Sequence, residues 1–172
     1  MPDMLVPLLK LPPHEPLLAA LREKHEVIIR RANAHEITPV RQFVQKNFSI
    51  RWADEILVGF SRQPISVYIA IERGKVIGFG AYECTRRGFF GPTGVAEKSR
   101  GKGIGTALLI ACLAGLREMG YAYGIIGGAG PVEFYRKTVH ATEIPGSVPG
   151  VYADPLARGK DRGARIESRR SR

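Results

Sequence analysis

The amino-acid sequence predicts an α/β protein in which helices cover the faces of a mixed, partly antiparallel sheet. Residues 65–95 hold three β-type segments separated by short turns, a pattern typical of an antiparallel meander. A glycine-rich turn leads from the third segment into a long apolar helix, after which strand and helix patterns alternate. The chain has 172 residues, of which 44% are hydrophobic, enough for one domain with its own core.

The N-terminal part of the sequence has the leucine spacing of a helix. Pro16 suits the first turn of that helix, because a first turn leaves its N–H groups unpaired and proline has none to lose. The leucines that share one helical face are Leu17, Leu18 and Leu21. We therefore expect residues 1–24 to form a helical extension that packs on the domain or on a partner, for example in a homodimer.

One strand and two helices are expected next. Residues 26–30 are β-type, and Thr38-Pro39 offers a hydroxyl cap followed by proline, which indicates the start of a helix. The inward-facing positions of this helix are Val40, Phe43 and Val44. A second helix is expected over residues 52–60.

The meander has clear boundaries. Segments 65–72 and 75–83 meet at Arg73-Gly74, a dipeptide typical of a hairpin turn. The third strand ends near Val95 and contains glycine and proline, which are poor strand formers and indicate a bulge.

Residues 105–119 predict the long apolar helix, and Gly120 is placed to end it. A buried strand is expected over residues 121–126 and a short helix over 132–138, with a glycine-rich break between them. The remainder, to about Leu156, predicts a closing pair of strands.

The turn Arg100-Gly101-Lys102-Gly103-Ile104-Gly105-Thr106 is the most informative stretch. Glycine lets a ligand approach the backbone closely, and the first turn of a helix presents unpaired N–H groups and the positive end of its dipole. Such a place binds phosphates readily, so we expect a nucleotide-bearing cofactor here. The turn is not a P-loop, because the Gly-Lys-Ser/Thr ending is missing. It also follows a meander, unlike the turn of a dinucleotide-binding fold.

The composition argues against a membrane protein, a secreted protein and a metal-binding protein. No apolar run approaches the roughly 20 residues of a membrane helix, and the apolar start of the chain lacks the cleavage site of a secretory signal. The two cysteines form no disulfide framework, and the dispersed histidines indicate no metal site. We expect a cytoplasmic protein that binds neither a membrane nor a metal.

The formal net charge of +10 is unevenly distributed. Residues 157–172 carry seven Arg and Lys against Asp161 and Glu167, about half of the excess. This segment has hardly any apolar residues, so it predicts a disordered tail that follows a domain over residues 25–156. The tail is either a solvated terminus or an arm that binds nucleic acid; the first is favoured because no aromatic residues are interleaved.

Two motifs resemble landmarks of the GNAT superfamily of acyl-coenzyme A-dependent N-acetyltransferases. Residues 95–109 are similar to its strand-to-helix signature, a valine followed by an Arg/Gln-x-x-Gly-x-Gly/Ala turn. Phe134-Tyr135-Arg136-Lys137 is similar to its aromatic–tyrosine pair on a later helix. The resemblance covers roughly residues 26–152 and implies the GNAT fold, with a mostly antiparallel sheet of six to seven strands. His140 departs from the glycine that many members have there, and Glu97 from a common proline.

The resemblance implies acetyl-CoA as the acyl donor and no metal. Main-chain N–H groups of the turn would cradle its pyrophosphate, and the strand ending at Val95 would splay from the strand at 121–126, so that pantetheine binds in the gap. A backbone N–H at Gly94 or Val95 would polarise the thioester carbonyl. The residues implied to bind the cofactor are Gly94, Val95, Arg100, Gly101, Lys102, Gly103, Ile104, Gly105 and Thr106.

Tyr135 is implied to be the general acid that protonates the leaving thiolate; the alternative is a core tyrosine whose hydroxyl bonds a backbone carbonyl.

The identity of the general base stays open. Candidates are Glu83, Asp54, Glu55 and Glu143, and an amine of low pKa needs no base. Trp52 either anchors its helix or lines the acceptor pocket.

The implied reaction is transfer of an acetyl group to a primary amine, a small molecule or a peptide, by direct attack in a ternary complex. Two other classes stay open. One is a non-catalytic acyl-CoA-binding module that acts as a sensor or scaffold. The other is a protein that binds nucleic acid through its basic tail, although nucleic acid is not the favoured partner.

Overall fold

The structure is a computed structural model that describes residues 1–152 and 156. Its centre is a seven-stranded sheet in the order β2-β3-β4-β5-β6-β1-β7. The strands are β1 Met4–Pro7, β2 Val27–Arg31, β3 Val67–Glu72, β4 Lys75–Tyr82, β5 Phe89–Val95, β6 Tyr123–Ile126 and β7 Thr142–Glu143. Only β5 and β6 pair in parallel within this sheet. The predicted α/β fold, with a mixed and mostly antiparallel sheet, is confirmed.

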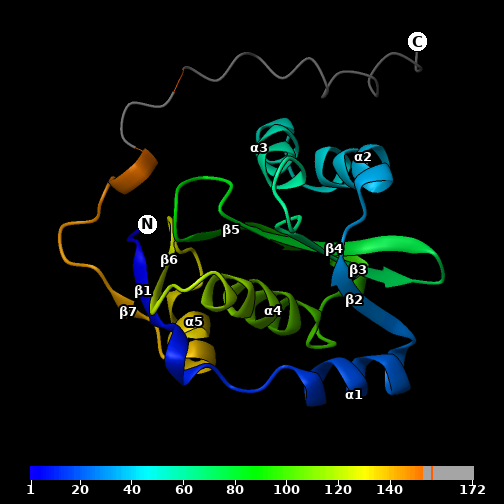
Figure 1. Cartoon of the computed structure of the whole chain (residues 1–172), viewed down its shortest axis with the longest axis horizontal. Helices are drawn as coiled ribbons and strands as arrows, with labels where there is room; N and C mark the ends of the chain where they lie inside the picture. The colour runs from blue at the N-terminus through cyan, green and yellow to red at the C-terminus, as the bar shows by residue number, and fades with distance from the viewer. Residues whose placement is uncertain (153–155, 157–172) are drawn as a thin grey trace, which may run out of the picture.

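Helices cover both faces of the sheet. They are α1 Glu15–His25, α2 Ile37–Asn47, α3 Ile50–Phe60, α4 Ile104–Glu118 and α5 Val132–Val139. One face carries α2 and α3, and the other carries α1, α4 and α5 (Figure 1). α4 is buried on nearly all sides, because it packs between the sheet and the chain that leads from β1 into α1. Among the helices of the described residues, none is long and apolar enough to cross a membrane.

The N-terminal residues differ from the prediction. The expected helix is present as α1, but Met4–Pro7 form a strand inside the sheet, so a purely helical extension over residues 1–24 is wrong. β1 lies beside β6 and β7 (Figure 1) and is antiparallel to both. Met4 and Val6 are fully buried. The alternation of these side chains fits a strand, but four residues beside a leucine-rich helix give too short a signal to decide.

The closing pair of strands is also corrected. Up to residue 152 the chain after α5 contributes a single strand, β7, and β1 fills the place between β7 and β6. The predicted tail at 157–172 lies outside the described residues.

The starts of α2 and α3 are set by capping residues, which the sequence pattern indicates only in part. α2 begins earlier than the expected Thr38 cap, because a short helix at Ala34–Glu36 leads into it. The Glu36 carboxylate accepts the Asn33 N–H at 2.7 Å, and the Asn33 main-chain carbonyl accepts the Glu36 N–H at 3.0 Å, which closes the first turn. Ser49 caps α3 by accepting the Trp52 N–H at 3.2 Å.

His140 ends α5 in the left-handed conformation, with φ at 55°. A side chain disfavours this conformation by roughly 1–2 kcal/mol, which explains why glycine is common at this kind of position. We expect His140→Gly to raise the free energy of unfolding by about 0.5–1 kcal/mol, measured by urea denaturation. His140→Ala is the control, since it retains a Cβ and should bring no such gain. Lower stability of the glycine variant would contradict this account of the turn.

Candidate functional site

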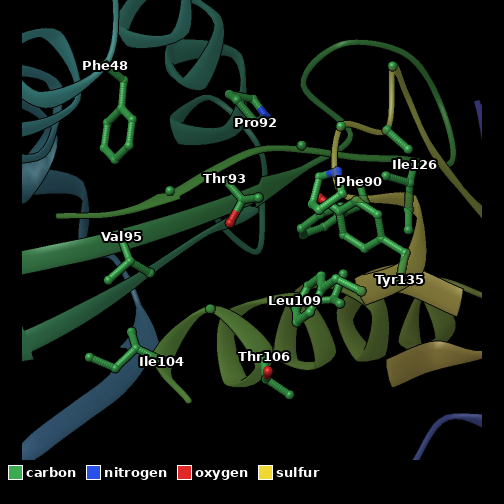
Figure 2. A pocket seen from close by; sticks show the side chains of 18 of the residues that line it. Phe48, Phe90, Pro92, Thr93, Val95, Ile104, Thr106, Leu109, Ile126 and Tyr135 are labelled. Carbon is green, nitrogen blue, oxygen red and sulfur yellow. The ribbon is translucent and has the colours of Figure 1, made fainter. Parts of the chain in front are cut away.

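A cavity of about 960 Å³ opens where β5 and β6 separate. The two strands pair only at Phe89–Ile125 and Phe90–Ile126. Beyond Phe90, residues 91–95 line the cavity, and no strand of the described residues pairs with them on that side. Figure 2 shows β5 and α4 on opposite sides of this space, with Tyr135 at one end. The predicted splay of the two strands is therefore present.

A bulge in β5 accompanies the separation. The pairing of β4 with β5 shifts register between Gly80 and Tyr82, so that β5 holds one extra residue near Pro92. Proline has no N–H to donate to a neighbouring strand. The bulge expected from the glycine and proline content of this strand is confirmed.

The register of β5 decides which backbone groups face the cavity. Ala96 donates its N–H to the Ile77 carbonyl at 2.9 Å, and hydrogen-bonded pairs alternate along an antiparallel ladder. With Gly78 opposite Val95 and Phe79 opposite Gly94, the Gly94 N–H faces β4 and the Val95 N–H faces away from it, toward the opening. Gly94 and Val95 were both predicted as donors to the oxyanion, and the N–H that points toward the cavity is that of Val95.

The turn into α4 presents a run of free amides to the same cavity. Arg100 donates its N–H to Glu97, and Ala107 donates to Gly103, but no hydrogen bond is found for the N–H groups of residues 101–106 within the described structure. Gly101 and Gly103 both have φ at 82°, which glycine adopts without strain. A Cβ at Gly101 would meet nothing within 4 Å, so the backbone here is open to a ligand.

The two cations of the turn have different surroundings. Arg100 lines the cavity, and its Nε donates to the Val95 carbonyl at 3.2 Å. Lys102 instead forms an ion pair with Glu72, with 2.9 Å between Nζ and Oε1, and does not line the cavity. The expectation that Lys102 lends its charge to the site is therefore not met. The charged side chains among the described lining residues are both arginines, Arg51 and Arg100.

Tyr135 reaches the cavity from α5. Its side chain packs edge-to-face on Phe90, with 6.5 Å between ring centroids, and the residue is 8% exposed. Burial raises the pKa of the Tyr135 hydroxyl above its usual value of 10. Within residues 1–152 this hydroxyl has no hydrogen-bond partner, so the alternative of a core tyrosine bonded to a backbone carbonyl finds no support.

Residues 63–138, which include β3 to β6 and most of α5, match the family model described as an acetyltransferase (GNAT) domain. This segment of 76 residues belongs to the GNAT acetyltransferase family. A search of curated protein sequences gave no significant match.

Solved structures share the GNAT fold at low sequence identity. A GCN5-related glucosamine N-acetyltransferase region of a fungal multi-domain GH3 β-N-acetylglucosaminidase is 18% identical over 83% of this chain and 19% of that one, with a TM-score of 0.66. A GCN5-related N-acetyltransferase from Sphaerobacter thermophilus is 19% identical over 83% and 48%, with a TM-score of 0.62. A GNAT family acetyltransferase from Brucella melitensis, in complex with acetyl-CoA, is 21% identical over 70% and 92%, with a TM-score of 0.52. The chain thus spans about a fifth of the fungal protein and about half of the Sphaerobacter one.

The four candidate bases do not line the cavity between β5 and β6. Each of their carboxylates instead forms a hydrogen bond or an ion pair outside the cavity. Glu83 is 1% exposed and accepts the Gly88 N–H, so it closes the loop before β5. Glu55 accepts a hydrogen bond from Thr85. Asp54 and Glu143 pair with Arg41 and Arg136.

Aromatic side chains from the α2–α3 region form another wall. The Phe48 ring lies so close to Gly94 that an added Cβ would be 2.4 Å from it, which makes glycine necessary there. Trp52 lies 5.6 Å from Phe48 between ring centroids and lines the cavity, while it also packs on Phe79. The sequence alone does not mark Phe48 as a site residue, because an aromatic residue after an amphipathic helix indicates core packing.

Both cysteines are free, and both are buried. Burial raises the pKa of Cys84 to about 12 and raises the pKa of Cys112 as well. We expect no reaction of either thiol with a thiol reagent at neutral pH until the protein is unfolded in guanidinium, because the thiolate is the reactive form. Rapid labelling of the native protein would contradict the buried positions.

Proposed function

We propose that the protein transfers an acetyl group from acetyl-CoA to a primary amine by direct attack within a ternary complex. The observation that carries this proposal is the run of unpaired amides at residues 101–106, all of which except Lys102 line the cavity between β5 and β6. Free N–H groups at the head of a helix bind phosphate, and an unpaired strand edge binds amide groups.

The residues present fit an acyl-CoA. The amides of residues 101–106 would hold the pyrophosphate, with Arg100 adding charge and the Thr106 hydroxyl a further donor. The free edge of β5 would bind the pantetheine amides as a neighbouring strand does. The thioester, when bound, supplies an activated acetyl group.

The chain's own groups serve two parts of the reaction. The Val95 N–H donates to the carbonyl oxygen as the amine nitrogen bonds to the carbonyl carbon, which stabilises the developing negative charge. When the carbon–sulfur bond breaks, the Tyr135 hydroxyl donates its proton to the sulfur. The amine loses its extra proton to water, and the tyrosine regains one from solvent.

The acceptor that suits this cavity is an amine of low pKa. The lining residues that the structure describes include no carboxylate or histidine to remove a proton, so the amine must arrive neutral. Phe48 and Trp52 offer flat apolar faces on which a ring can stack. Glucosamine combines a ring with an amine of this kind, and the similar fungal region is named for it. It is therefore the first acceptor to test.

Thiol release from acetyl-CoA, followed with glucosamine and a panel of other amines, tests the proposal. We expect thiol release that depends on the amine and forms its N-acetyl derivative. Coenzyme A binding without thiol release from any amine would favour a non-catalytic acyl-CoA-binding module. Failure to bind coenzyme A at all would overturn the proposal.

A further inference from the structure

The residue before β1 contacts a loop of the cavity. Asp3 is 6% exposed, and its Oδ1 accepts the Gly128 N–H at 2.7 Å. Next to it, the Pro2 carbonyl accepts the Ala129 N–H at 2.7 Å. Two successive amides of the loop after β6 are therefore held by the segment that leads into β1, the strand between β6 and β7 (Figure 1).

This loop connects the sheet to Tyr135. Residues 127–131 all line the cavity, and Pro131 is the cap residue of α5. The Pro131 carbonyl accepts the N–H of Phe134 at 3.0 Å and that of Tyr135 at 3.3 Å. A displacement of Gly128 would thus move the first turn of the helix that carries the tyrosine.

Asp3 is itself fixed from the opposite side. Its main-chain N–H donates to the Ser147 Oγ at 2.9 Å, and its carbonyl accepts the Ile144 N–H at 2.9 Å. Gly150, in the left-handed conformation, lets the chain pass close to the carboxylate, since a Cβ there would lie 3.0 Å from Oδ2. A buried carboxylate is costly unless it is hydrogen-bonded, so the Gly128 contact is needed for its burial.

Gly128 also requires support from outside the loop. Its φ of 56° lies in the left-handed region, and three of the five loop residues are glycine, which has the largest conformational freedom to lose. A charge-assisted hydrogen bond to its amide restricts that freedom at the second residue after β6.

We propose that Asp3 is a positioning residue for acetyl transfer: through the Gly128 amide, its carboxylate holds the 127–131 loop so that Tyr135 faces the cavity. This inference rests on the proposed function. Asp3 does not line the cavity, so it acts through the position of Tyr135.

Kinetics of three variants test this role. We expect Asp3→Ala to lower kcat about tenfold with less than about a threefold change in KM for acetyl-CoA, because a small misplacement of a catalytic group lowers the rate more than it weakens binding. Asp3→Asn keeps an acceptor oxygen for Gly128 and should restore kcat to within about threefold. Ser147→Ala removes the hydroxyl that accepts the Asp3 main-chain N–H but leaves the carboxylate in place, so it is the control, with kcat close to wild type. If Asp3→Ala does not fold, Asp3→Ser, whose hydroxyl is one bond shorter, replaces it.

Two further readouts separate positioning from general destabilisation. In a cycle with Tyr135→Phe, adding Asp3→Ala should lower kcat less than it does in the wild-type background, since the group that it positions is already absent. Amide hydrogen exchange of residues 127–135 should be about tenfold faster in Asp3→Ala and unchanged in Ser147→Ala. This exchange measurement needs no active enzyme, so it shows whether Asp3 holds the 127–131 loop even if the proposed activity fails. Additive losses of kcat, or unchanged exchange in Asp3→Ala, would overturn the inference.

Discussion

Replacing Gly105 by glutamate is expected to abolish coenzyme A binding while leaving the protein as stable as wild type. Gly105 has a helical conformation, and a Cβ there would meet only Val95, at 3.8 Å and within the cavity. An acidic residue in the first turn of a helix is favourable for the free protein. A carboxylate about 4 Å from a phosphate charge, however, is repelled by about 4 kcal/mol at an effective dielectric constant of 20. Calorimetry should show binding weakened at least about 100-fold.

The same substitution at the other end of α4 is the matched control. A Cβ at Gly120 would meet nothing within 4 Å, and Gly120 does not line the cavity, so Gly120→Glu should bind coenzyme A as wild type does, even though its φ of 94° brings a stability loss of roughly 1–2 kcal/mol. Gly103→Glu should lose binding as well, but with a stability loss of roughly 1–2 kcal/mol because its φ is 82°. Wild-type affinity in Gly105→Glu would place the diphosphate elsewhere.

Tyr135→Phe is expected to lower kcat about 100-fold and to change KM for acetyl-CoA by less than about threefold. The substitution keeps the ring packing on Phe90 and removes only the hydroxyl, which has no partner in the described part of the chain. Tyr123→Phe, at an exposed position of β6 outside the cavity, is the control and should retain full activity.

The pH dependence of kcat gives an independent check of this role. Burial raises the pKa of Tyr135, so the hydroxyl keeps its proton to a higher pH than a free phenol would. The loss of kcat that reflects ionisation of this acid should therefore lie above pH 10, and it should be absent from Tyr135→Phe. Equal turnover of wild type and Tyr135→Phe would remove tyrosine from the mechanism.

Most of the fold was predictable because its signals are local. The hairpin needs two left-handed residues, and Arg73-Gly74 supplies them with φ at 49° and 74°. The long helix and its glycine-rich start are likewise defined by neighbouring residues. β1 was not predictable, because its partners β6 and β7 lie more than a hundred residues away and its four residues carry little pattern.

The features of the candidate site likewise fall into those that the sequence predicts and those that it does not. The backbone elements, the phosphate turn and the splayed strand, follow from glycine and proline placement along the chain. Side-chain pairings that join distant segments do not, so Lys102 was expected in the site although Glu72 binds it. Phe48 was not predicted as a site residue, because only the folded structure brings its ring into contact with Gly94, which is distant in sequence. Asp3 was missed because a single acidic residue near the N-terminus belongs to no motif.

A titration of the labelled protein with coenzyme A, followed by backbone amide chemical shifts, tests the central claim most directly. We predict that the largest shifts occur at residues 101–106, whose N–H groups have no partner in the described structure of the free protein. Saturating coenzyme A that shifts other amides and leaves these six unchanged would contradict the assignment of the site and, with it, the proposed reaction.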